Sequence, residues 1–158
     1  MSRRPHLSIP ALLFGLVLAP LSGCGLRAVD VDVYDPQPDT TDICTDLVKD
    51  LPRTIGNAVE RKVSPDTGVS AAWGDHAIVL RCGVEMPSEY RPDAILTQID
   101  GVDWLPVEGD GGYFFTTIGR EATVEVAVPH AYAPEAEVLT ELAPSLQRIL
   151  PVAADAGS

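Results

Sequence analysis

The sequence predicts an α+β domain, in which a mostly antiparallel sheet of about five strands is covered by an N-terminal and a C-terminal helix. Two patterns predict this class: alternating apolar segments separated by glycine-rich turns fill the middle of the chain, and apolar residues recur at helical spacing near both ends. A third observation agrees with them. Cys44 lies on the apolar side of the first helical segment and Cys82 on the apolar side of a strand segment, so one disulfide would join helix to sheet.

The first helical segment begins near Thr41, where a threonine supplies an N-cap. Its apolar face consists of Cys44, Leu47, Val48 and Leu51. Pro52 interrupts this segment, but Ile55 and Val59 continue the apolar stripe. We therefore expect the helix to resume for two more turns and to end at the turn over residues 64–68.

Strands are expected at residues 69–73, 77–82, 93–99, 102–107, 113–118 and 122–128. The first two form a hairpin across Gly74-Asp75, and the last two form a hairpin across Gly119-Arg120. Pro106 has no N–H to donate, which restricts its strand to a sheet edge or a bulge.

Pro134 opens the last predicted helix, whose apolar residues recur at helical spacing and which Pro144 should bend. The apolar face of this helix consists of Val138, Leu142, Leu146 and Ile149. The chain thus divides into a signal segment (1–23), an acidic flexible tether (24–40), a single domain (41–150) and a disordered tail (151–158).

The N-terminal residues resemble the signal peptide of a bacterial lipoprotein precursor. Two arginines precede an apolar run at residues 9–21, which is too short to span a membrane. The run ends in Leu-Ser-Gly immediately before Cys24, and this sequence is similar to a lipobox, in which the cysteine is acylated and becomes the first mature residue. The alternatives are an ordinary signal cut near this site and an uncleaved anchor. The arginine pair leaves open both the general secretory and the twin-arginine export route.

Acylation of Cys24 predicts a protein held at the outer face of the cytoplasmic membrane, because two or more acyl chains anchor stably. It leaves Cys44 and Cys82, an even number in an oxidising compartment, for one disulfide. A metal-binding pair or a redox pair is the alternative. Neither has support, since the sequence contains no C-x-x-C motif and no second cluster of ligands.

Acidic residues outnumber basic ones by 23 to 11, which gives a formal net charge of −12. Nucleic acid is not expected as a partner, because phosphate binding needs clustered lysine and arginine. The acidity serves solubility. It also predicts repulsion from anionic lipids, so the lipid on Cys24 rather than basic side chains must hold the protein at the membrane.

No motif in the sequence indicates catalysis, a cofactor or a metal. His76 beside Asp75 has the form of an oriented base, but such a pair at a tight turn commonly serves the turn alone. Asp75, His76 and Asp103 lack the spacing of a metal site. Residues 109–112 are rich in glycine, yet Asp110 among them would repel a phosphate. We therefore expect a protein that is not an enzyme.

Trp73, Arg81, Trp104 and Arg120 form the predicted interaction surface, since aromatic residues and arginine are enriched in binding hot spots. The alternative is structural: the tryptophans pack inside the domain and the arginines pair with some of the many carboxylates.

Several short motifs occur in a fixed order after Cys44. They are Ala72-Trp73-Gly74, Leu80-Arg81-Cys82-Gly83, Gly101-Val102-Asp103-Trp104 and Thr116-Thr117-Ile118-Gly119-Arg120. Together they resemble an actinobacterial group of small secreted lipoproteins classed as domain of unknown function 3515. The resemblance covers residues 44–150 and implies an envelope location and an actinobacterial source, but no activity and no site residues.

The leading functional hypothesis is a non-catalytic lipoprotein that serves as an interaction or accessory module of the bacterial cell envelope, with an envelope protein as its partner. The first alternative is a small-ligand-binding lipoprotein, which requires a concave apolar pocket. The second is an envelope hydrolase that uses His76 with Asp75.

Overall fold

The computed structural model describes residues 27–154, so the signal segment and Cys24 lie outside the described part of the chain. The helices are α1 Thr41–Asp50, η1 His130–Tyr132 and α2 Glu137–Ile149. The strands are β1 Val29–Asp30, β2 Thr54–Ile55, β3 Ala58–Arg61, β4 Val63–Ser64, β5 Ser70–Trp73, β6 Ile78–Cys82, β7 Thr97–Ile99, β8 Val102–Gly109, β9 Gly112–Ile118 and β10 Val124–Pro129. No helix in this part of the chain is long and apolar enough to cross a membrane.

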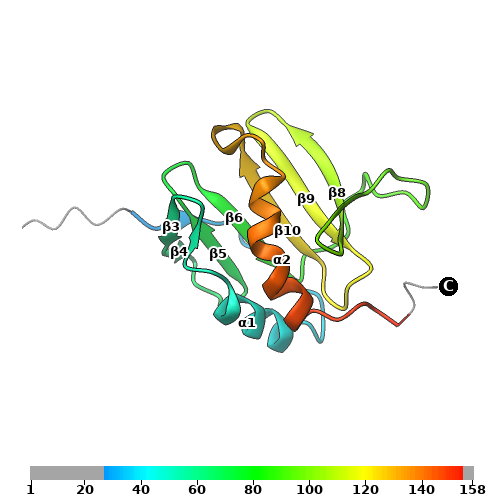
Figure 1. Ribbon diagram of the computed structural model, residues 1–158. Coiled ribbons are helices and arrows are strands. Elements are labelled where there is room, and N and C mark those ends of the chain that lie inside the picture. Colours follow the sequence, from blue (N-terminus) through cyan, green and yellow to red (C-terminus); the bar gives the residue numbers. More distant parts are fainter. Residues whose placement is uncertain (1–26, 155–158) are drawn as a thin grey trace, which may run out of the picture.

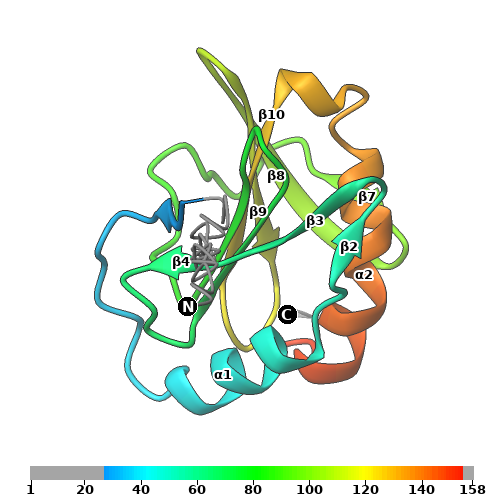
Figure 2. The ribbon, with the colours of Figure 1, turned by 90° about the vertical axis from the view of Figure 1, so that its left-hand side faces the viewer.

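The predicted α+β class is confirmed, but the sheet is larger than expected. Eight strands, rather than about five, form an antiparallel sheet in the order β2-β3-β5-β6-β10-β9-β8-β7 (Figure 1). Helix α2 lies along one face of this sheet, and α1 crosses its lower end beside α2 (Figure 2). The small parallel pair β1–β4 lies on the opposite side, which we call the open face.

Strand β6 shows how the sheet separates its two faces. Ile78, Leu80 and Cys82 are fully buried on the side of α2, while Val79 and Arg81 between them are partly exposed on the open face. Helix α2 contributes the apolar stripe of Leu139, Leu142, Leu146 and their neighbours to the same core. The helix begins at Glu137, three residues later than the predicted start at Pro134. Pro134 lies in the preceding turn, where its carbonyl accepts a hydrogen bond from the Glu137 amide.

Helix α1 begins at Thr41 as predicted, but it does not resume beyond Pro52. The following residues form the β2–β3 hairpin instead, and the predicted helical continuation is wrong. Gly56, with φ of +55°, provides the left-handed conformation that the two-residue turn requires. Ile55 is buried whereas Val59 is 61% exposed, so these two residues do not form one stripe.

Both predicted hairpins are confirmed. Strands β5 and β6 pair with Trp73 opposite Ile78, and β9 pairs with β10. Pro106 lies in β8 beyond the last residue that β7 pairs, Trp104, so the missing N–H falls on a free edge. Of the strand expected at 93–99, only Thr97–Ile99 forms.

Residues 27–40 lie against the domain and do not form the predicted flexible tether. The Val29 amide donates to the Lys62 carbonyl over 2.8 Å, and β1 continues this pairing along β4. Val31 is only 8% exposed. The Tyr34 hydroxyl donates to the Cys82 carbonyl at 2.9 Å, which attaches the segment to the end of β6. Backbone pairing with β4, the buried side chain of Val31 and the Tyr34 hydrogen bond thus hold this segment against the domain.

The C-terminal residues also differ from the prediction of a tail that is disordered from residue 151. The Ala153 amide donates to the Gly119 carbonyl at 2.9 Å, and Val152 forms a β-bridge with Arg120. Residues 151–153 therefore pair with the β9–β10 loop.

The predicted disulfide is present. Cys44 and Cys82 are fully buried, and their Cα atoms are 5.5 Å apart. The bond joins the first half of α1 to the end of β6, so a helix that begins the domain is held to a central strand.

Removing this bond should lower the free energy of unfolding by about 4 kcal/mol in the chain-entropy model, because it closes a loop between cysteines 38 residues apart. Urea unfolding with and without reductant measures the loss. The Cys44→Ala/Cys82→Ala variant serves as the control, since reductant should leave its stability unchanged. A fall in the free energy of unfolding of less than about 1 kcal/mol on reduction would contradict a stabilising role for this disulfide.

Tyr34→Phe should cost about 1 kcal/mol and raise amide hydrogen exchange at Val29 and Val31, because the hydroxyl bond to the end of β6 is lost. Burial raises the pKa of Tyr34. The contribution of the neutral phenol is therefore full below about pH 10 and declines as the pH rises further. Unchanged exchange in the variant would show that the segment is held by other contacts.

Candidate functional site

The four residues predicted as an interaction surface do not form one. Trp73 and Trp104 are 1% and 0% exposed, and both point into the core. The Trp73 indole N–H donates to the Pro52 carbonyl at 2.8 Å. The Trp104 indole N–H has no acceptor among the described residues. The prediction is thus wrong for both tryptophans, and the structural alternative is correct.

The two arginines of the predicted surface are engaged in the fold. Arg81 and Glu125 are cross-strand neighbours on the open face, joined by hydrogen bonds of 2.6 and 3.2 Å. The Arg81 guanidinium also lies 5.5 Å from the centre of the Tyr34 ring. Arg120 donates to the carbonyls of Leu150 and Gly101 over 2.9 and 2.6 Å, and thereby joins the β9–β10 loop to the end of α2 and to the β7–β8 turn.

His76 and Asp75 lie exposed on the turn between β5 and β6, at the rim of an open hollow of about 380 Å³. Arg61 and Tyr132 also line this hollow, and burial raises the pKa of Tyr132. No serine, threonine or cysteine is among the residues that line this hollow.

A metal centre has no support within residues 27–154, where no three histidine, cysteine or acidic side chains converge. Asp103, which was considered with Asp75 and His76 as a metal site, accepts a hydrogen bond from Gln98 at 2.9 Å.

Two carboxyl groups with a lowered pKa, those of Asp50 and Glu135, take part in contacts that hold the fold together. A hydrogen bond from Arg148 lowers the pKa of Asp50 and joins the end of α1 to α2. A hydrogen bond with His130 lowers the pKa of Glu135 beside η1.

The open face carries a cross-strand row of apolar side chains. The row runs from Val79 on β6 through Ala127 on β10 and Phe114 on β9 to Val107 on β8. Each of these side chains is at least partly exposed, and Phe114 is 42% exposed. Gly109 leaves room for the phenylalanine ring, since a Cβ there would lie 2.9 Å from Phe114 Cε2.

Acidic residues border the β8–β9 end of this row. Two open hollows, of about 350 and 280 Å³, flank Phe114. Asp110 lines the first, and Glu89 and Glu108 line the second. We call the apolar residues Val107, Phe114 and Ala127 with the acidic residues Glu89, Glu108 and Asp110 the acidic–apolar patch.

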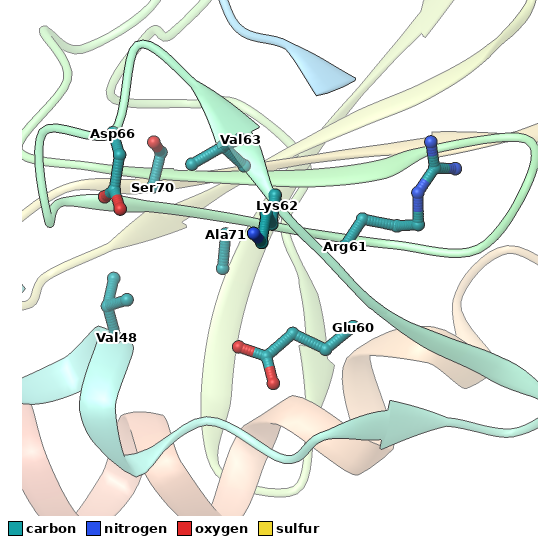
Figure 3. A pocket seen from close by; sticks show the side chains of 8 residues that line it. All are labelled: Val48, Glu60, Arg61, Lys62, Val63, Asp66, Ser70 and Ala71. Carbon is teal, nitrogen blue, oxygen red and sulfur yellow. The ribbon is translucent and has the colours of Figure 1, made fainter. Parts of the chain in front are cut away.

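A fourth hollow, of about 370 Å³, lies toward the other edge of the sheet, between α1 and the strands β3 and β5 (Figure 3). Glu60, Lys62 and Asp66 project around it, while Arg61 points away from it. The Arg61 guanidinium instead donates to the carbonyls of Gly74 and Arg27 over 2.7 and 2.5 Å. Arg27, Arg61 and Lys62 thus gather where the described chain begins, and we call them the basic edge.

The sequence analysis missed Phe114 and Lys62. The signal for Phe114 was available: it is out of phase with Phe115, which occupies the core position of β9, so it must point to the other face. For Lys62 no local signal existed, because its placement depends on a pairing with the distant segment at Val29.

Residues 7–154 match the family model described as "Protein of unknown function (DUF3515)", a span that includes every described strand and helix. No curated protein and no solved structure shows significant similarity to the chain.

The ion pair between Arg81 and Glu125 should contribute measurably to the stability of the fold. In a double-mutant cycle with Arg81→Met and Glu125→Gln, we expect a coupling energy of about 1–2 kcal/mol, because both side chains are largely shielded from solvent. Urea unfolding of the four proteins measures it. The exposed pair Lys49–Asp46 is the matched control and should couple by less than about 0.5 kcal/mol. Equal coupling energies in the two pairs would contradict this prediction, because Arg81 would then be bound no more strongly than an exposed surface residue.

Proposed function

We propose that this chain, which belongs to the DUF3515 family of proteins of unknown function, is a non-catalytic lipoprotein that binds a partner protein at the outer face of the cytoplasmic membrane. The family description assigns no activity, so the proposal is drawn from the residues of this chain.

The location is supported by two features. Cys24 ends a segment similar to a lipobox, and the buried bond between Cys44 and Cys82 is typical of a protein that folds in an oxidising compartment. The resemblance of the motifs, together with the presence of only two lysines among many alanine, glycine and proline residues, favours the envelope of an actinobacterium.

The binding role is carried by the acidic–apolar patch. An exposed phenylalanine on a sheet face, continued by Val107 and Ala127, leaves apolar surface in contact with water. Its acidic border selects a partner with an apolar side chain flanked by lysine or arginine, since complementary charge determines partner choice and association rate. The patch lies on β8 and β9, several strands from β3 and the start of the described chain, which leaves it free for a second protein.

A small ligand is less well supported than a protein. The hollows beside Phe114 are open to solvent, whereas a small-molecule site encloses most of its ligand. Shallow surface with a central aromatic side chain and a charged border is the form of a protein interface.

Photo-crosslinking of the membrane-anchored full chain tests the proposal. With benzoyl-phenylalanine in place of Phe114, we expect one discrete protein adduct, reduced at least about tenfold by Glu108→Lys and Asp110→Lys together, because the basic partner is repelled. The same photoreactive residue at Val59, which is 61% exposed on β3, is the positional control and should not yield this adduct.

Two outcomes would contradict the proposal. Adducts of the same size and yield at both positions would mean non-specific contact, and an adduct that persists after charge reversal would mean that the acidic border selects nothing. Cys24→Ala, which should release the protein from the membrane, tests the anchor separately from the patch.

A further inference from the structure

We infer that the basic edge, formed by Arg27, Arg61 and Lys62, rests on the anionic head groups of the membrane in which the protein is anchored. This inference depends on the proposed acylation of Cys24. It gives the domain a defined orientation, with the β3–β4 end toward the lipid and the acidic–apolar patch away from it.

Backbone pairing brings these three cations together. The amide of Val29 donates to the carbonyl of Lys62 at 2.8 Å, so the residues that precede β1 leave the domain beside the β3–β4 junction. Arg61 then donates to the carbonyl of Arg27 over 2.5 Å. Carbonyl partners leave the guanidinium charge of Arg61 unneutralised, and among residues 27–154 the Arg27 side chain has no ion pair.

The charges of the basic edge are not paired within the described chain. The ion pairs among residues 27–154 involve other cations, namely Lys49, Arg53, Arg81, His130 and Arg148. Glu60, the carboxylate nearest in sequence, is bound by Arg53 at 3.1 Å. Asp66 lies across the hollow of Figure 3, Asp30 is the second residue of β1, and Asp75 lines the same hollow as Arg61. These carboxylates reduce the positive charge of the edge, but none forms an ion pair with its three cations among the described residues.

Chain length then brings this edge to the lipid surface. Two residues separate Arg27 from Cys24, and the three steps between these positions span at most about 10 Å even when extended. The screening length at physiological salt is about 8 Å, so Arg27 lies at most a little more than one screening length from the acylated residue, where anionic lipids still attract a cation.

The net acidity of the protein is compatible with this contact, because the acidic–apolar patch lies far from the basic edge. Four inter-strand steps of about 4.8 Å separate β3 from β9, which places the acidic–apolar patch roughly 19 Å further away, more than two screening lengths. Repulsion predicted from net charge alone therefore applies to the distant part of the domain and not to the edge that contacts the lipid.

The two lysines of the chain provide a direct test. The acylated full-length protein is reconstituted in phosphatidylcholine vesicles with and without phosphatidylglycerol, and a water-soluble amine reagent is applied. Lys49, whose side chain is 69% exposed, is the internal reference, and mass spectrometry gives the two labelling rates. We expect labelling of Lys62 relative to Lys49 to fall at least about threefold in anionic vesicles and to recover in about 1 M salt, where the screening length is about 3 Å.

Arg27→Gln should weaken the protection of Lys62, while Arg91→Gln, the same charge change on the loop before β7 at the opposite sheet edge, should not (Figure 1). Equal labelling ratios in both kinds of vesicle would overturn the inference, as would protection that is insensitive to salt. If the protein does not float with the vesicles at all, the proposed anchor fails instead, and the two failures are thus distinguished.

Discussion

The bond between Cys44 and Cys82 determines how the first helix meets the rest of the molecule. Helix α1 has ten residues, fewer than an isolated helix needs to be stable in water, so its structure depends on contacts with its surroundings. The disulfide fixes its first half to β6. At its other end, the Ser145 hydroxyl and the Arg148 guanidinium of α2 bind the backbone and side chain of Asp50. The two helices therefore act as one layer against the sheet.

This one-sided layer explains why the open face is where function is to be sought. The helix side is filled by a continuous core, in which Leu47, Trp73 and Trp104 are almost completely buried. On the open side, Tyr34 and the N-terminal segment cover the end of β6, and the Arg81–Glu125 pair occupies the next row. What stays in contact with water is the apolar row that includes Phe114 and ends at Val107, and the packing of the core does not explain why this surface is apolar.

Sequence patterns predicted those features that depend on neighbouring residues. The β5–β6 and β9–β10 hairpins follow from alternation and from the glycines between the strands, and they are confirmed. The Cys44–Cys82 bond was predicted because each cysteine lies among the apolar positions of its own segment, one a helix and the other a strand. The helical reading beyond Pro52 failed because Ile55 and Val59, four residues apart, also fit a hairpin whose turn is Gly56-Asn57. Short strands of two residues carry too few positions to distinguish the two periods.

The candidate site was predicted less well, because it depends on pairings between distant segments. Trp73 and Trp104 stand beside turn residues, which suggested exposure, yet each is in phase with the buried positions of its strand. The sequence near residue 62 contains no local pattern that predicts pairing with the N-terminal segment. Local sequence therefore identifies hairpins and helices, whereas the meeting of β1 with β4, which determines where the chain leaves the domain, emerges only from the folded arrangement.

Docking of the N-terminal segment changes what a lipid anchor would do for this protein. A free tether of residues 24–40 would let the domain rotate at the end of a flexible chain of roughly 20–25 Å, so that every surface could face the membrane in turn. Residues 27–40 are instead held by β4 and by Tyr34, so on the proposed function only two residues would separate the docked chain from the acylated Cys24, and rotation about the anchor would be limited. On the proposed function, a domain anchored so closely would present one sheet edge to the lipid and the other to the surroundings. On the proposed function, that geometry directs the acidic–apolar patch toward a partner and keeps Phe114 away from the bilayer, in which an exposed aromatic side chain would otherwise insert.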